Sequence, residues 1–134
     1  MSPVVVLDTD FIIDLMRGER RAVDRLNELL EAPDPVGVCT ITLMQLYHGV
    51  ARARVAQDEA ARIDRALRGM TAFDLTREVA VAAGRIDGEL AAAGTAIDPA
   101  DVIIGATALG RNEAVVTCNR RHFSRIKGLR VLDH

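Results

Sequence analysis

The amino-acid sequence predicts an α/β fold with three layers, in which helices cover both faces of a central, mostly parallel sheet. Hydrophobic residues make up 49% of the chain and aromatic residues only 3%, so the core must be built from aliphatic side chains. Short β-branched runs alternate with longer stretches of helical periodicity, as they do in βαβ units. With 134 residues, the chain is too short for two ordinary domains, and we expect a single domain over residues 1–134.

The first half of the chain begins with a short β-branched run that ends at Asp8, which is typical of a fully buried first strand. Asp10 is expected to cap the following helix and Gly18 to end it. The expected elements are a strand over 3–7, helices over 11–17 and 19–31, a strand over 36–41, and helices over 42–55 and 57–69.

The second half repeats this alternation. The pair Asp98–Pro99 is a strong helix start, because it places an N-cap side chain before a proline at the first helical position. The expected elements are a brief strand over 72–75, a helix from Thr76 to the residue before Gly94, a helix over 100–109, and strands over 114–117 and 129–132.

The formal net charge is only −2, which argues against a uniformly basic protein but leaves room for a local basic face. The N-terminus has no charged segment followed by a long apolar stretch, and nowhere do about 18 apolar residues run unbroken. We therefore expect a cytoplasmic protein with no membrane partner. Cys39 and Cys118 have no metal-site or redox spacing and are expected to be buried free thiols.

Polar side chains follow several of the expected strands. Asp8 ends the first strand, Gln45 begins the helix after the second, and Asn119 follows a late strand that ends at Thr117. Ligands of open α/β sheets bind beyond the carboxyl ends of the strands. Asp101, in the first turn of its helix, reaches the same place if that helix packs beside the first strand.

Carboxylates gathered at one point repel each other unless a cation lies between them. Mg²⁺ and Mn²⁺ prefer oxygen ligands and retain several waters, so two or three protein oxygens suffice to bind them. We therefore expect Asp8 and Asp101 to be metal ligands of a site that hydrolyses a phosphodiester through a metal-activated water.

Simpler interpretations compete with this one. Thr42 with Gln45, and Asp98 with Asp101, have the spacing of helix capping boxes. Asp8 could likewise cap the helix that follows it. However, a charge directly after a buried strand needs a partner, which favours a ligand role for Asp8.

Other kinds of site find little support. The three histidines, His48, His122 and His134, are far apart along the chain and form no zinc motif. No Gly-rich phosphate loop follows the first strand, and neither serine lies in a nucleophile elbow.

The densest basic stretch of the sequence lies near the C-terminus, next to the expected site. Basic side chains there would neutralise RNA phosphates, or would simply form a solvated face. The candidate RNA-binding residues are Arg120, Arg121 and Arg125, with Lys127, Arg130 and the helical Arg52 and Arg54 as further positive charges. Phe123, in the same stretch, is expected to belong to the core rather than to stack on a base.

Taken together, the motifs Val4–Thr9, Thr40–Gly49, Asp98–Ala108, Val116–Phe123 and Ile126–Leu129 resemble, in order and spacing, those of VapC-like PIN domains. The resemblance implies a PIN fold and Mg²⁺- or Mn²⁺-dependent RNA cleavage by the toxin of a type II toxin–antitoxin pair. It also implies inhibition by a VapB-like antitoxin that inserts near the active site, and a homodimer.

The resemblance assigns the first acidic ligand to Asp8, the third to Asp101 and the late hydroxyl to Thr117. Two positions depart from the family pattern. The second acidic position is Gln45, and the late acidic position falls at Asn119. An amide brings no negative charge and cannot act as a base, so Gln45 is expected to impair metal binding.

Two alternatives follow. A PIN module with amides at two acidic positions could bind RNA or an antitoxin without cleaving. The pair Asp8 and Asp10 after a buried strand also imitates the nucleophile motif of haloacid-dehalogenase-like phosphatases, but the later lysine and acidic pair of that family are missing.

Overall fold

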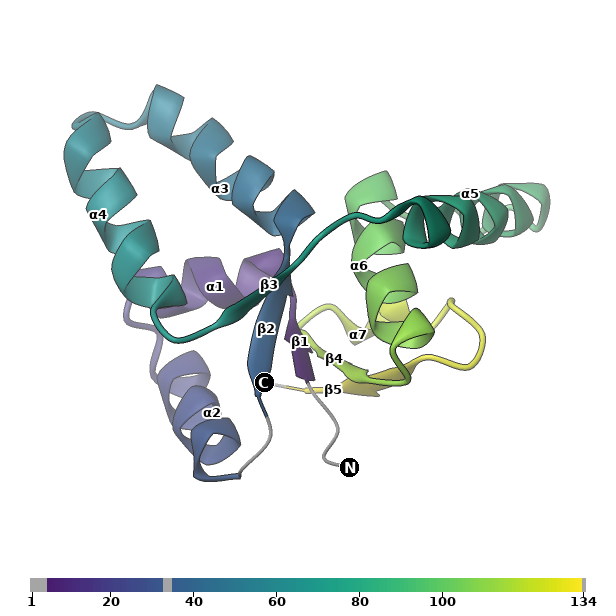
Figure 1. The fold of residues 1–134 in the computed structure, drawn as a ribbon, viewed down its shortest axis with the longest axis horizontal. Helices are drawn as coiled ribbons and strands as arrows, with labels where there is room; N and C mark the ends of the chain where they lie inside the picture. The colour runs from purple at the N-terminus through teal and green to yellow at the C-terminus, as the bar shows by residue number, and fades with distance from the viewer. Residues whose placement is uncertain (1–4, 33–34, 134) are drawn as a thin grey trace.

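The computed structural model describes residues 5–32 and 35–133, which fold into five strands and seven helices (Figure 1). The elements are β1 (Val5–Leu7), α1 (Thr9–Met16), α2 (Arg20–Glu31), β2 (Val36–Cys39), α3 (Thr40–Arg52), α4 (Ala56–Leu67), β3 (Thr71–Phe73), α5 (Arg77–Ala92), α6 (Pro99–Gly110), β4 (Ala114–Val116), α7 (Arg120–Phe123) and β5 (Arg130–Leu132).

The five strands form one sheet in the order β3-β2-β1-β4-β5, and all four pairings are parallel. The chain first builds outward from β1 to β2 and β3, and it then crosses back to place β4 on the other side of β1. This reversal is a topological switch point between β1 and β4, where loops diverge and open α/β sheets bind their ligands.

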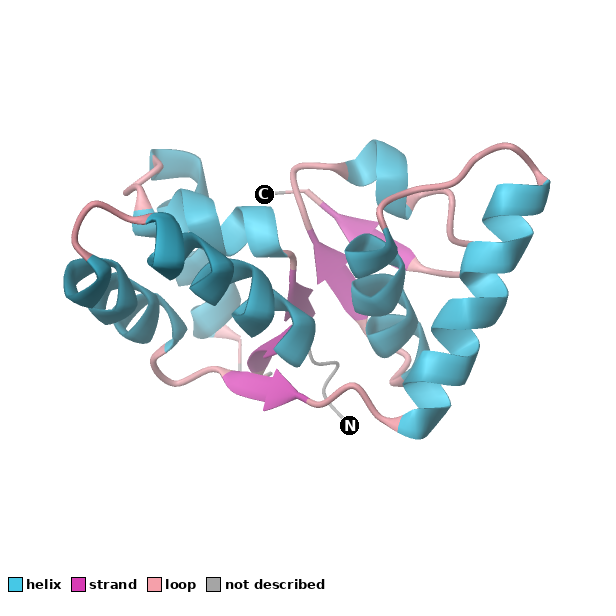
Figure 2. Ribbon diagram, turned by 90° about the horizontal axis from the view of Figure 1, so that it is seen from above, coloured by secondary structure: helices cyan, strands magenta, loops and turns pink. Residues whose placement is uncertain are grey.

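The helices cover both faces of the sheet (Figure 2). Alternate residues of β1 point to opposite faces: Val6 packs in the core with α5 and α6, whereas Val5 and Leu7 pack in the core with α1, α3 and α4. Each helical layer thus buries one row of β1 side chains, which confirms the expected three-layer α/β/α architecture.

Several expected element boundaries were wrong. The helix α1 begins at Thr9, so Asp8 and not Asp10 occupies its N-cap position, and Asp8 makes no side-chain capping bond. The strand β2 ends two residues early, and α3 runs over Thr40–Arg52 because Cys39 already has the extended backbone of an N-cap residue. The short helix α7 was not expected. Residues 3–4 of the first expected strand and Pro33 lie outside the described residues.

The two cysteines differ in their surroundings. Cys39 is buried in the core as expected, but Cys118 is exposed, because it lies just beyond the buried run that ends at Thr117. Phe123 is fully buried, which confirms its expected place in the core. Within residues 5–32 and 35–133, none of the helices combines the length and the apolar character needed to cross a lipid bilayer.

We predict that Gly37→Ala, in β2, destabilises the protein. A Cβ atom at this position would lie 2.8 Å from the backbone oxygen of Thr71 and would also collide with the ring of Phe73. The expected loss in the free energy of unfolding is about 1–3 kcal/mol, measured by denaturant titration. Gly49→Ala is the control, because nothing lies within 4 Å of its Cβ and alanine favours helix α3. Equal stability of the two variants would contradict the packing described for β2 and β3.

Candidate metal centre

The carboxylate of Asp8 lies at the switch point and is joined to the neighbouring strand's end. Asp8 directly follows β1, and Thr117 directly follows β4. The hydroxyl of Thr117 donates a hydrogen bond of 2.7 Å to Oδ2 of Asp8, and the backbone N–H of Asp8 donates to the Val116 carbonyl at 3.1 Å. Parallel pairing of β1 with β4 brings these two residues together although 109 positions separate them in the sequence.

Asp8 is only 2% exposed, and burial raises the pKa of its carboxyl group from 3.8 to about 6. The hydrogen bond from Thr117 lowers this pKa, whereas the nearby charges of Asp10 and Asp101 raise it. Among the residues that the structure describes, Asp8 forms no ion pair with an arginine or lysine. The site therefore holds a buried carboxylate that has no arginine or lysine partner among residues 5–32 and 35–133.

Asp101, in the first turn of α6, lies close enough to Asp8 for its charge to raise the pKa of Asp8. Its Oδ2 lies 3.6 Å from Nδ1 of His122, and burial followed by the charge of Asp98 raises its pKa. The same His122 nitrogen lies 2.8 Å from the side-chain amide nitrogen of Asn119. Asn119 in turn donates its backbone N–H to the Thr117 hydroxyl at 2.8 Å, so hydrogen bonds and close contacts link Asp8 to Asp101 through the segment after β4 and through α7.

The two expected capping boxes have different outcomes. The Asp98 carboxylate caps α6 by accepting the backbone N–H of Ala100 at 2.8 Å, and within the described residues the Asp101 side chain accepts no bond from the Asp98 backbone N–H. Thr42 is not an N-cap, because it lies inside α3 and its hydroxyl lies 2.9 Å from the hydroxyl of Thr9. The Thr9 hydroxyl donates to Oε1 of Gln45 at 2.6 Å. Gln45 is therefore bonded to the residue that directly follows Asp8, and not to Asp8 itself.

The three candidate RNA-binding arginines differ in their engagement. Arg125 donates to the backbone carbonyls of Thr95 and Ala96 at 3.4 and 3.3 Å, before α6. Arg120 pairs with Asp133 at 3.7 Å, and both side chains are more than half exposed. Arg121 is exposed and has no hydrogen bond or ion pair to any residue of the described part of the chain.

The donor set fits a hard cation with few protein ligands. Within the described residues, no three His, Cys, Asp or Glu side chains are grouped closely enough to hold a metal ion by themselves. Asp8 and Asp101 are nevertheless close enough for their charges to interact, and the Asp8 carboxylate is buried without an arginine or lysine partner among the described residues. Mg²⁺ and Mn²⁺ complete their coordination with water, so two carboxylates suffice, whereas a zinc site needs more nitrogen or sulfur donors.

Two residues near the centre were not expected there. Asp10 lies in the first turn of α1, and its charge acts on both Asp8 and Asp101. The Asp-x-Asp spacing after a buried strand carried this signal, although capping was the interpretation given to Asp10. His122 was set aside because it has no histidine partner in sequence, and its contact with Asp101 arises only from the packing of α7 against α6.

Comparison with known proteins identifies the family. The model of the PIN domain family matches residues 5–129. The chain belongs to the PIN domain family.

Several relatives of this PIN domain are ribonucleases by name. It is 33% identical over 96 residues to the tRNA(fMet)-specific endonuclease VapC of Salmonella typhimurium, and the matched region covers 72% of this chain and 73% of that protein. It is 29% identical over 125 residues to ribonuclease VapC2 of Haemophilus influenzae, covering 93% of each.

Solved structures share the fold over the whole chain. DNA-bound VapBC from Salmonella typhimurium superposes with a TM-score of 0.88 at 29% identity and covers 98% of both chains. VapBC2 from Rickettsia felis, bound to a promoter DNA fragment, superposes with a TM-score of 0.89 at 23% identity, again over 98% of both. The PIN fold is therefore established, and the haloacid-dehalogenase alternative is wrong.

We predict that Asp8→Asn stabilises the metal-free PIN domain at neutral pH. Because the folded-state pKa of Asp8 lies above its unfolded value, folding loses stability as the pH rises from about 4 through about 6. The variant has no carboxyl group to ionise at this position, so its free energy of unfolding at pH 7 should exceed that of the wild type by up to about 3 kcal/mol. The measurement is the free energy of unfolding against pH in the presence of a chelator.

Asp58→Asn is the control for this comparison, because Asp58 is an exposed first-turn carboxylate of α4. Its pH profile should follow that of the wild type. Parallel profiles for the wild type and Asp8→Asn would contradict the burial of an unneutralised carboxylate at the end of β1.

Proposed function

We propose that this PIN domain is the ribonuclease toxin of a VapBC-type pair and that it hydrolyses RNA phosphodiester bonds with Mg²⁺ or Mn²⁺. The observation that carries the proposal is the buried Asp8 carboxylate, fixed by Thr117 at the switch point in the field of Asp101. The names of the VapC relatives support RNA as the substrate.

Asp8 and Asp101 would hold the cation through their carboxylate oxygens. When bound, the cation supplies a coordinated water of lowered pKa and stabilises charge on the phosphodiester. Thr117 donates to Asp8 Oδ2 and so fixes which oxygen of that carboxylate remains available. His122 and Asn119 limit the movement of Asp101 and of the loop that follows β4.

Of the three candidate RNA-binding arginines, Arg121 and Arg120 are exposed and able to meet RNA phosphates. The pair between Arg120 and Asp133 is exposed and therefore weak, so exchanging it for a phosphate costs little. The Arg125 side chain, in contrast, donates hydrogen bonds to two backbone carbonyls and so stabilises the segment before α6.

The partners follow from the same proposal. Solved relatives include VapBC complexes, which supports a VapB-like antitoxin as the protein partner of this chain. We expect residues 1–134 to act as a single domain and to form a homodimer in the cytoplasm, where RNA substrates are available.

We predict that Asp101→Asn lowers metal-dependent RNA cleavage by about 100-fold or more, because it removes one of two ligating carboxylates. Mn²⁺ should also raise the melting temperature of the wild type but not of the variant. Asp98→Asn is the matched control, since it loses the same charge nearby while asparagine still caps α6. A wild type that shows neither cleavage nor stabilisation by Mn²⁺ would favour a binding module without catalytic activity.

A further inference from the structure

A chain of hydrogen bonds fixes the side-chain amide of Gln45. The Thr9 hydroxyl has one proton, which it donates to Oε1 of Gln45 at 2.6 Å. The 2.9 Å contact between Thr9 and Thr42 must then have Thr42 as its donor. Both threonines are buried, at 7% and 0% exposure, so this relay is shielded from water.

The relay determines which polar atoms Gln45 offers to a ligand. Its carbonyl oxygen is engaged by Thr9, so the two N–H donors of the amide remain. Gln45 also lines a hollow of about 370 Å³ between α1, α3 and α4, with Ile13 and Met16 on its apolar side. This volume lies within the range of small-molecule sites, about 300–1,000 Å³.

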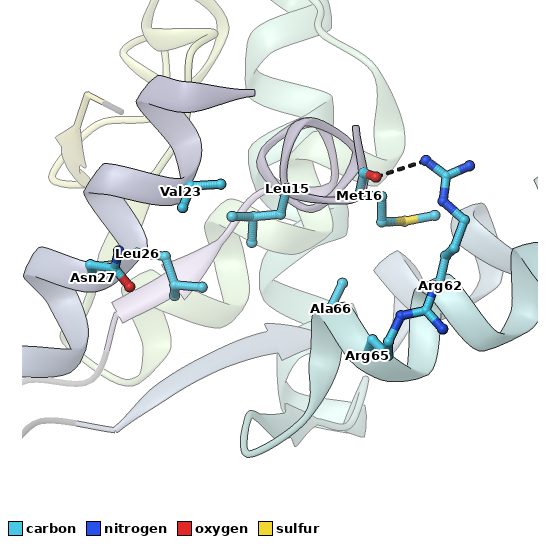
Figure 3. Close-up of a pocket in the computed structure, with 8 residues that line it drawn as sticks. All are labelled: Leu15, Met16, Val23, Leu26, Asn27, Arg62, Arg65 and Ala66. Carbon is cyan, nitrogen blue, oxygen red and sulfur yellow. Dashed lines mark hydrogen bonds between the residues drawn. The ribbon is translucent and has the colours of Figure 1, made fainter. Parts of the chain in front are cut away.

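The hollow has an available positive charge. Arg62 lines it but is occupied, because it donates to the Met16 carbonyl at 2.7 Å and to Glu59 at 3.4 Å. Figure 3 shows the first of these bonds tying α4 to the end of α1, beside a second, smaller hollow between α1, α2 and α4. Arg17, in contrast, is exposed and has no hydrogen bond or ion pair from its side chain to the described residues.

Gln45 connects the hollow to the segment that carries Asp8. Gln45 is bonded to Thr9, and Thr9 directly follows Asp8. Because a single residue links Gln45 to Asp8, the nucleotide that adjoins a phosphate bound at Asp8 is the part of an RNA substrate that would meet Gln45. An amide can donate to that nucleotide, whereas a glutamate at this position could only accept and would repel phosphate.

We propose that the hollow between α1, α3 and α4 is a subsite for the nucleotide next to the scissile phosphate, with the Gln45 amide donating to the polar edge of its base and Arg17 pairing with its phosphate. The inference rests on the proposed ribonuclease function. It makes Gln45 a substrate-binding donor rather than a metal ligand.

The test is the affinity for a fluorescently labelled single-stranded oligoribonucleotide, measured by anisotropy in the presence of a chelator so that no cleavage occurs. Gln45→Met and Arg17→Ala should each weaken binding by about three- to tenfold. Gln57→Met and Arg21→Ala are matched controls on exposed helix surfaces and should bind as the wild type does. Gln45→Glu should also bind RNA more weakly, because it replaces two donors by a negative charge.

Arg17 lies on the surface, so its replacement tests the subsite even where Gln45→Met disturbs folding. Unchanged affinity of Arg17→Ala and of a folded Gln45→Met would overturn the subsite, and wild-type cleavage with Mg²⁺ would then leave the proposed function standing. Weakened binding by both variants supports the subsite, even where the wild type fails to cleave and only the hydrolytic function is contradicted.

Discussion

The hydrogen bond from Thr117 to Asp8 connects the two strand ends on which the candidate site is built. This bond forms because β4 pairs in parallel with β1, so the residues that follow the two strands lie at the same edge of the sheet. A carboxylate buried there carries a cost in desolvation, which appears as its raised pKa. In the proposed function, binding of a cation offsets this cost, and Asp101 would supply the second negative charge.

Much of the fold could be predicted from sequence because its signals are local. The β-branched run before Asp8 and the Asp98–Pro99 helix start both depend on neighbouring residues alone, and both elements lie where they were expected. The boundary between β2 and α3 could not be placed in this way. Thr40 and Ile41 have high strand propensity and were expected in the strand, but they form the first turn of α3, which packs against α4 and α6.

The candidate site was predicted only as far as chain topology determines it. Asp8, directly after the first strand, was placed correctly at the end of the sheet where parallel strands share a common edge. Thr117 was expected as the last residue of its strand, and it directly follows β4 instead. The contact of His122 with Asp101 depends on how α7 packs against α6, and nothing in the local sequence indicates that packing. The same holds for Thr42, whose hydroxyl bonds to Thr9 from another helix rather than to its own backbone.

The most direct test of the account is the position of a bound cation. Crystals of the protein grown with Mn²⁺ would show the ion by its anomalous scattering. The account predicts one strong peak between the carboxylates of Asp8 and Asp101, with water completing the coordination. A peak elsewhere on the molecule, or Asp8 and Asp101 side chains directed away from each other, would contradict it.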